Sequence, residues 1–117
     1  MILYCDEDIG TRVPRALKLV GLKVISAVGK GVVSEPDIQW LERAGKKGWL
    51  GLSCNKDILN VPEEHDAITN NNVGIVFFST GNLHPKDKLL LILRKWHWLE
   101  TIDETESRPF AFYLYLT

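Results

Sequence analysis

Short apolar runs alternate along the chain with segments whose apolar residues recur at helical spacing. Five runs fit buried strands, at residues 2–5, 22–28, 49–53, 73–78 and 110–116. The intervening segments fit helices that begin after Thr11, after Ser34, near Pro62 and near Pro85. Strands that alternate with helices favour a mostly parallel sheet covered on both faces. The pattern therefore predicts a three-layer α/β/α fold, of the α/β class, with a five-stranded sheet.

Local signals predict where the helices begin and end. Thr11 is expected to cap the first helix, and Ser34 the second, which Gly45 would end. The apolar stretch from Pro85 to about Glu100 predicts one long, buried helix. The polar residues 101–108 would connect it to the last strand.

Length and charge indicate the general class of protein. A chain of 117 residues with 45% apolar residues can form one core, so we expect a single domain over residues 1–117. The 14 Lys and Arg residues nearly balance the 15 Asp and Glu residues, giving a net charge of −1. This balance argues against a protein that coats nucleic acid electrostatically, but it allows a local basic rim around an acidic site.

The expected compartment is the cytoplasm. The N-terminal residues have no basic segment before an apolar one, so we expect no secretory signal. The longest apolar run has five residues, 89–93, whereas a bilayer span needs roughly 20. No membrane partner is therefore expected. Cys5 and Cys54 are expected to remain free thiols, as is usual in a reducing compartment.

Acidic residues follow two of the predicted strands. Asp6, Glu7 and Asp8 come directly after the first strand, and Asp57 follows the third. Asp37 lies in the first turn of the helix after the second strand. Ligands of parallel sheets bind outside the carboxyl ends of the strands, so these acids are expected at one rim. Crowded carboxylates with oxygen donors suit Mg²⁺ or Mn²⁺. Taken singly, each acid could also serve only as a helix cap or a turn residue.

Five short motifs occur in an order known from one protein family. They are Leu3-Tyr4-Cys5-Asp6-Glu7-Asp8, Arg15-Ala16-Leu17-Lys18 with Gly21, Asp37-Ile38-Gln39-Trp40-Leu41, the stretch from Gly48 to Ile58, and Pro109-Phe110-Ala111-Phe112. In this order they resemble PIN-domain proteins, in particular the small PIN-like group exemplified by toxin-type ribonucleases of bacterial toxin–antitoxin pairs. The resemblance spans nearly the whole chain.

The resemblance implies a Mg²⁺- or Mn²⁺-dependent ribonuclease, a hydrolase, with strand order 3-2-1-4-5. Asp6 would match the first metal-binding acid of the family and Asp37 the second. The third acid normally stands in a Ser/Thr-x-Asp pattern, and that register places Asn55 there. Asn keeps an oxygen ligand but lacks the charge, which weakens the expected Mg²⁺ binding. Asp57 would then replace it, or match a further acid seen in some members. The implied catalytic set is thus Asp6, Asp37 and Asp57, with Asn55 as a metal ligand.

Basic and hydroxyl residues near the expected rim are candidates for binding RNA phosphates. Arg12, Arg15 and Lys56 could hold phosphates, and Ser79 or Thr80 could donate a hydrogen bond to one. Each of these side chains also fits an ordinary surface charge or turn residue.

Two other functions remain open. A receiver-like phosphoacceptor domain would use Asp57 as acceptor beside Asp6, Glu7 and Asp8, but such receivers also need a late Lys, and none follows Lys95. A catalytically weakened PIN-like binding module is favoured by Asn55.

The expected partners follow from the ribonuclease interpretation. They are an RNA substrate and a cognate antitoxin whose segment would fill the acidic groove. Trp96 and Trp98 lie two apart on the last helix, so one of them could also face a second copy of the chain in a homodimer.

Overall fold

The five strands of the computed structural model, which describes residues 1–27, 35–80 and 82–115, form one parallel sheet. They are β1 (Leu3–Cys5), β2 (Val24–Ser26), β3 (Leu50–Ser53), β4 (Gly74–Phe78) and β5 (Phe110–Leu114). The helices are α1 (Arg12–Leu19), α2 (Asp37–Lys47), α3 (Pro62–Asn70), α4 (Pro85–Arg94) and α5 (Trp96–Thr105), with 3₁₀ turns η1 (Glu7–Ile9) and η3 (Lys56–Asn60). The predicted α/β class is confirmed.

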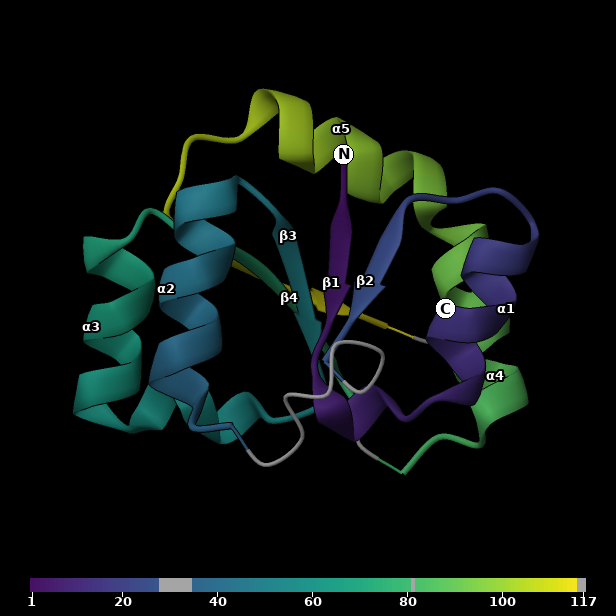
Figure 1. The fold of residues 1–117 in the computed structure, drawn as a ribbon, viewed down its shortest axis with the longest axis horizontal. Coiled ribbons are helices and arrows are strands. Elements are labelled where there is room, and N and C mark those ends of the chain that lie inside the picture. Colours follow the sequence, from purple (N-terminus) through teal and green to yellow (C-terminus); the bar gives the residue numbers. More distant parts are fainter. Residues whose placement is uncertain (28–34, 81, 116–117) are drawn as a thin grey trace.

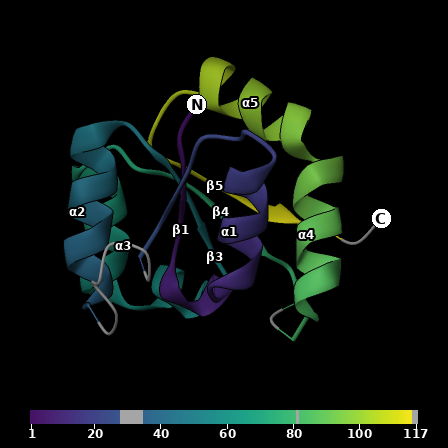
Figure 2. The ribbon, with the colours of Figure 1, turned by 45° about the vertical axis from the view of Figure 1, so that its right-hand side comes forward.

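Helices cover both faces of the sheet, as Figures 1 and 2 show. Helices α2 and α3 pack together on one face, while α1, α4 and α5 lie on the other. Each face has its own core. The α2/α3 core centres on Tyr4, Trp40, Leu41, Ile75 and Phe77, and the other core on Leu3, Leu17, Leu52, Phe78 and Ile92. This three-layer arrangement is the one that the hydrophobic pattern predicts.

The order of the strands differs in one respect from the predicted 3-2-1-4-5. The observed order is β2-β1-β3-β4-β5, so that β3 pairs directly with β1. The burial of the two strands explains this difference. Every residue of β3 is buried, which suits an interior position, whereas β2 has three residues and its middle residue, Ile25, is only partly buried, which suits an edge. The carboxyl ends of β1 and β3 therefore lie side by side.

Two predicted helix boundaries are corrected. Helix α2 continues past Gly45 to Lys47, and Gly48 ends it with φ 69° and ψ 23°, a left-handed conformation that favours glycine. The expected long helix is broken at Lys95, where φ is −98° and ψ is 5°, into α4 and α5. Helix α5 then extends to Thr105, so most of the expected polar connector is helical. Thr11 precedes α1 without a side-chain cap, and Ser34 lies outside the described residues.

The cysteines are free, as expected. Cys5 ends β1 and Cys54 directly follows β3, so they stand at the ends of two paired strands, whereas the predicted order would place β2 between these strands. Burial raises the pKa of Cys5 to about 12 and that of Cys54 to about 11. Neither thiol is therefore a nucleophile near neutral pH.

Among the described residues, no helix combines the length and the apolar character needed to cross a bilayer.

Candidate functional site

The two strands that end at the candidate site are β1 and β3. The chain continues from β1 to β2 on one side and then crosses to β3 on the other, so the strand order reverses between β1 and β3. In open α/β sheets, ligands bind in the crevice outside the carboxyl ends of the strands at such a point. Asp6 stands there, because its N–H donates to the carbonyl of Leu52 at 2.9 Å and carries the β1–β3 pairing one residue further.

Ser53, the last residue of β3, joins two carboxyl groups. Its hydroxyl lies 2.9 Å from Oδ2 of Asp6 and 3.2 Å from Oδ2 of Asp8. The backbone N–H of Glu7 donates to the other Asp6 oxygen at 2.7 Å, and that of Cys54 donates to Asp8 at 3.1 Å. These contacts fix both carboxyl groups against the end of β3.

Burial makes this pair of carboxyl groups hard to ionise. Asp6 is 5% exposed, and desolvation, together with the charges of Asp8 and Asp37, raises its pKa to about 7. Desolvation also raises the pKa of Asp8, although the Cys54 N–H, the Ser53 hydroxyl and Lys88 oppose the shift. A cation near Asp6 would favour its charged form.

Asp37, the first residue of α2, lies on the opposite wall of the site. Trp40, one turn later, donates its indole N–H to Oδ1 of Asp37 at 2.8 Å. The side-chain amide of Asn55 lies 3.4 Å from the other oxygen, Oδ2. The backbone N–H of Asn55 in turn donates to the hydroxyl of Ser53 at 2.9 Å. Asn55 thus connects the wall that carries Asp6 with the wall that carries Asp37.

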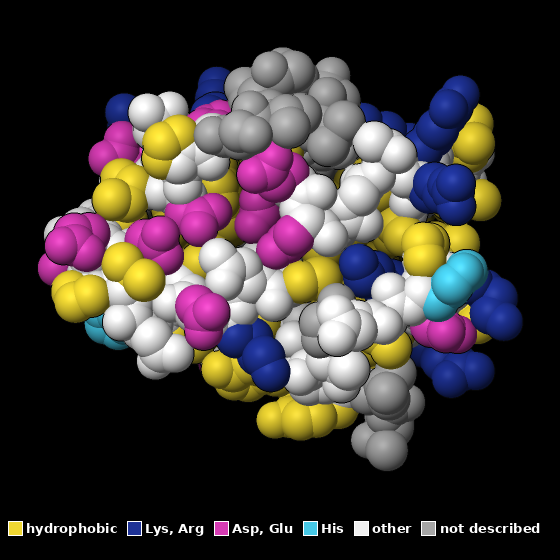
Figure 3. All heavy atoms as spheres, turned by 90° about the horizontal axis from the view of Figure 1, so that it is seen from below, with side chains coloured by type: hydrophobic (Ala, Val, Ile, Leu, Met, Phe, Trp, Pro, Cys, Tyr) yellow, Lys and Arg dark blue, Asp and Glu magenta, His cyan; other side chains and the backbone are white. Residues whose placement is uncertain are grey.

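These walls enclose an open hollow of about 460 Å³. Its lining residues are Asp6, Glu7, Asp8, Glu35, Pro36, Asp37, Ile38, Asn55 and Glu64. Figure 3, which looks onto this end of the molecule, shows Asp and Glu side chains gathered in one part of the face. Arg43 binds one of the acids, Glu35, through two hydrogen bonds of 2.7 and 3.1 Å.

Comparison with known protein families gives one match, to the family described as PIN like domain, over residues 1–80. The chain belongs to the PIN-like domain family. The matched region runs from β1 through β4 and contains every residue that lines the hollow. No curated protein and no solved structure matches the chain. PIN-like domains are generally nucleases that use Mg²⁺ or Mn²⁺.

The oxygen donors at this site suit a metal ion that keeps several bound waters better than an ion that is coordinated by protein atoms alone. Within residues 1–27, 35–80 and 82–115, no three His, Cys, Asp or Glu side chains converge closely enough to hold a metal ion. Mg²⁺ nevertheless usually keeps several waters and needs only one or two direct carboxylates. Asp6 and Asp37 could supply these from opposite walls, with the side-chain oxygen of Asn55 as a neutral donor.

Other residues singled out in the sequence lie outside the hollow. Asp57 was expected beside the other acids, but it is exposed in the first turn of η3 and does not line the hollow. The turn into η3 directs its side chain away, because Ile58, the next residue, is the one buried in the core. The candidates for RNA contacts, Arg12, Arg15, Lys56, Ser79 and Thr80, also do not line it. Lys56 donates to the backbone carbonyl of Ser79 at 2.8 Å.

Three charged residues at or near the site were not singled out from the sequence. Glu64 of α3 reaches the hollow, where desolvation and the charge of Asp37 raise its pKa. Glu35 also lines it, bound by Arg43. Lys88 of α4 is only 8% exposed, and its ammonium lies 3.5 Å from the backbone carbonyl of Asp8. No local sequence signal distinguishes these three residues from ordinary surface charges.

Proposed function

We propose that this PIN-like domain is a Mg²⁺- or Mn²⁺-dependent endoribonuclease that hydrolyses RNA phosphodiester bonds. The observation that supports it most is the placement of Asp6 and Asp37 on opposite walls of one hollow at the β1–β3 switch point. Burial of Asp6 beside Asp8 adds to this, because an acid with a pKa near 7 gains charge when a cation binds.

In this proposal, Asp6 and Asp37 hold the ion directly, with Asn55 as a third, uncharged ligand. A bound Mg²⁺ or Mn²⁺ would supply Lewis-acid stabilisation of the charge that grows on the reacting phosphate. Asp8 has a different role, because its two oxygens accept hydrogen bonds from Cys54 and Ser53. It positions the end of β3 relative to β1.

Asp57 stays outside the proposed ligand set because it is exposed on η3 and does not line the hollow. Lys56, with Ser79 and Thr80, is proposed to contact RNA phosphates beyond the hollow, since its ammonium reaches Ser79. Arg12 and Arg15 are exposed on α1 and would act at longer range.

The biological role that we propose is that of the toxin of a toxin–antitoxin pair, acting in the cytoplasm. The acidic hollow would then accept a basic segment of a cognate antitoxin, because the opposite charge would replace the cation there. Co-expression with the product of a neighbouring short gene, followed by co-purification, tests this role.

RNA cleavage by the purified protein tests the nuclease proposal. Wild-type protein with Mn²⁺ should cleave single-stranded RNA, and Asp6→Asn and Asp37→Asn should each lose most of that activity. Glu63→Gln is the matched control, because Glu63 is exposed in the first turn of α3 and does not line the hollow. Equal cleavage by wild type and Asp6→Asn would contradict the proposal.

A second candidate function is a PIN-like binding module with weakened catalysis, which Asn55 favours. Its uncharged side chain stands where the family pattern has an acid. Such a module would bind RNA or the antitoxin in the presence of Mn²⁺ while leaving RNA intact.

The receiver-like alternative is supported by the strand order 2-1-3-4-5, which flavodoxin-like proteins and receivers share. Its proposed acceptor, Asp57, does not line the hollow with Asp6 and Asp8. Incubation with a small phosphodonor followed by mass measurement tests it, and an unchanged mass would exclude it.

A further inference from the structure

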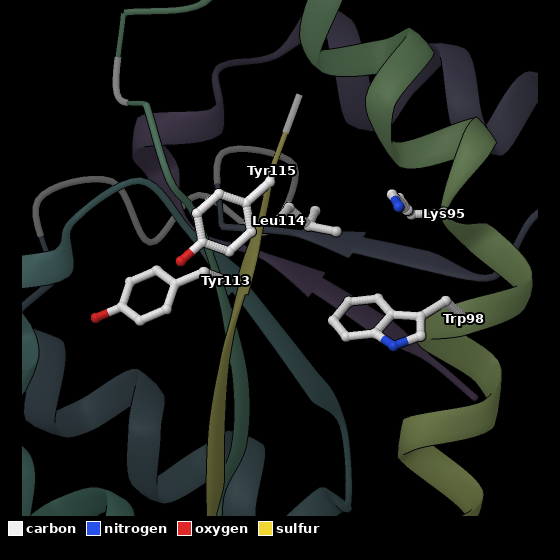
Figure 4. Close-up of a pocket in the computed structure, with 5 residues that line it drawn as sticks. All are labelled: Lys95, Trp98, Tyr113, Leu114 and Tyr115. Carbon is white, nitrogen blue, oxygen red and sulfur yellow. The ribbon is translucent and has the colours of Figure 1, made fainter. Parts of the chain in front are cut away.

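A second pocket lies at the far edge of the sheet, outside the region matched by the PIN-like family. It runs beside β5 and has a volume of about 280 Å³. Figure 4 shows its lining, which comprises Lys95, Trp98, Tyr113, Leu114 and Tyr115. The rings of Tyr113 and Tyr115 lie on one side of the strand, and Trp98 and Lys95 lie across from them. We call this pocket the β5 groove.

The rings of the β5 groove are held in place but remain accessible. Tyr113 and Tyr115 are 37% and 59% exposed, and their centroids lie 6.4 Å apart. Tyr113 packs against Phe77 at 5.9 Å, while Trp98 packs edge-on against Phe112 at 5.8 Å. Fixed, exposed aromatic rings are the usual platforms on which bases of single-stranded nucleic acid stack.

The strand between these rings also offers polar groups. β5 is the last strand of the sheet and pairs with β4 on one side only. Among the described residues, none forms a hydrogen bond to its outer edge. Free backbone N–H and C=O groups can pair with the edge of a base, and the ammonium of Lys95 can pair with a phosphate. The groove therefore combines the three kinds of contact that a nucleotide needs.

The β5 groove is connected to the acidic hollow along the carboxyl ends of the strands. Ser79, after β4, donates its N–H to the carbonyl of Leu114 at 2.9 Å, and its own carbonyl accepts from Lys56 at 2.8 Å. Lys56 follows β3, next to Asn55 of the hollow. Three strand spacings separate β1 from β5, or roughly 14 Å. That distance corresponds to about four nucleotides at the stacked spacing of roughly 3.4 Å.

Electrostatics explains why a nuclease of this kind would need such a groove. The hollow is lined by carboxyl groups and the net charge of the chain is −1, so RNA gains little from long-range attraction. Stacking does not depend on charge, and it can hold RNA in spite of this repulsion. On the basis of the proposed ribonuclease function, we propose that the β5 groove binds a nucleotide of single-stranded RNA a few positions away from the bond that is cleaved.

RNA binding without cleavage tests this inference. The probe is a fluorescent single-stranded RNA of about ten nucleotides, titrated with Asp6→Asn protein in EDTA and followed by anisotropy. On that background, Tyr115→Leu and Lys95→Gln should each weaken binding about fivefold or more. The matched controls are His97→Leu, an exposed ring on α5 outside the groove, and Lys47→Gln, an exposed lysine at the end of α2. Both controls should bind as the parent does.

Cleavage of two substrates separates a binding role from a structural one. In a chain with Asp6 intact, Tyr115→Leu should raise KM for the longer RNA and leave cleavage of a dinucleotide unchanged, since a dinucleotide does not reach the groove. If Tyr115→Leu and Lys95→Gln weaken RNA binding by the Asp6→Asn protein while the wild type is inactive, the ribonuclease function would be refuted but the groove supported.

Equal binding by Tyr115→Leu, Lys95→Gln and the parent would overturn the inference and leave the ribonuclease function intact. A wild-type dimer that Tyr115→Leu converts to a monomer would also overturn it, because a second copy of the chain would then cover the groove.

Discussion

The hydroxyl of Ser53 contacts the carboxyl group of Asp6 at 2.9 Å across the paired ends of β3 and β1. The same hydroxyl lies 3.2 Å from Asp8 and accepts the N–H of Asn55 at 2.9 Å. A serine has one proton to donate, so it can donate to only one of the two carboxyl groups at a time. A protonated Asp6 resolves this, because it can donate to Ser53 while Ser53 donates to Asp8. The raised pKa of Asp6, about 7, fits such a shared proton.

The stability of the metal-free protein should therefore depend on pH through Asp6. Its pKa is about 7 in the fold against 3.8 for the unperturbed group, so the folded state binds more protons between these values. The stabilisation that comes from protonated Asp6 is complete below about pH 4 and is lost as the pH rises through 7. Asp6→Asn, which is neutral at every pH, should be more stable than wild type at pH 8, on the order of a few kcal/mol.

Urea unfolding at pH 4 and pH 8 measures this difference. Asp66→Asn, on the exposed surface of α3, controls for the simple loss of a carboxylate. A lower stability of Asp6→Asn than of wild type at pH 8 would contradict this prediction, because it would mean that the fold holds an ionised Asp6 with no loss in the free energy of unfolding.

Divalent metal should stabilise the wild-type protein. At pH 8, Mn²⁺ bound to the fold alone should raise the free energy of unfolding by about 2.7 kcal/mol at a hundredfold excess over Kd. Asp37→Asn should lose most of this gain because one wall then lacks its charge. Thermal unfolding with and without Mn²⁺ measures it, and Glu63→Gln should behave as wild type does. A melting temperature that Mn²⁺ leaves unchanged would count against the metal site.

Asn55→Asp should strengthen metal binding and weaken the metal-free fold. The change adds a carboxylate to the hollow, and it replaces an amide donor, 3.4 Å from Asp37, with a like charge. We expect about tenfold tighter Mn²⁺ binding in calorimetry, or about 1.4 kcal/mol. Asn60→Asp, exposed at the end of η3, is the matched control. Unchanged affinity would remove Asn55 from the ligand set.

Lys88→Met should destabilise the protein, and more at high pH than at low pH. The variant leaves the carbonyl of Asp8 without this donor and removes a positive charge that opposes the raised pKa of Asp8. We expect a loss of about 1–3 kcal/mol at pH 8. Lys86→Met is the control, because Lys86 lies on the same helix and is exposed. Equal effects of the two variants in urea unfolding would show that Lys88 has no special role.

Much of this architecture could be predicted from local patterns. The runs that became β1, β3 and β4 are almost entirely apolar, and burial on both faces of a parallel sheet requires that. Helix α3 begins at Pro62, as its sequence signals indicate. The break at Lys95 was not predictable in this way, because neither Gly nor Pro occurs near it in the sequence.

The candidate site was predictable in part. Asp6 and Asp37 could be singled out because each opens a new element after a strand, and that position alone directs them toward the carboxyl ends. Glu64 and Lys88 could not, since nothing near them in the sequence marks them as neighbours of β1. Asp57 was expected beside the other acids, but it does not line the hollow. Its position two residues after Asn55 does not indicate where its side chain lies, because η3 turns the chain there.

The sequence by itself determined where most strands and helices lie and that acids follow the strands, because hydrophobic spacing and capping act over a few neighbouring residues. Only the tertiary structure decided that β3 lies between β1 and β4, which the predicted order made neighbours, and hence that Ser53 meets Asp6. That choice depends on how fully each strand can be buried against helices far away in the chain, and a local pattern carries no information about such packing.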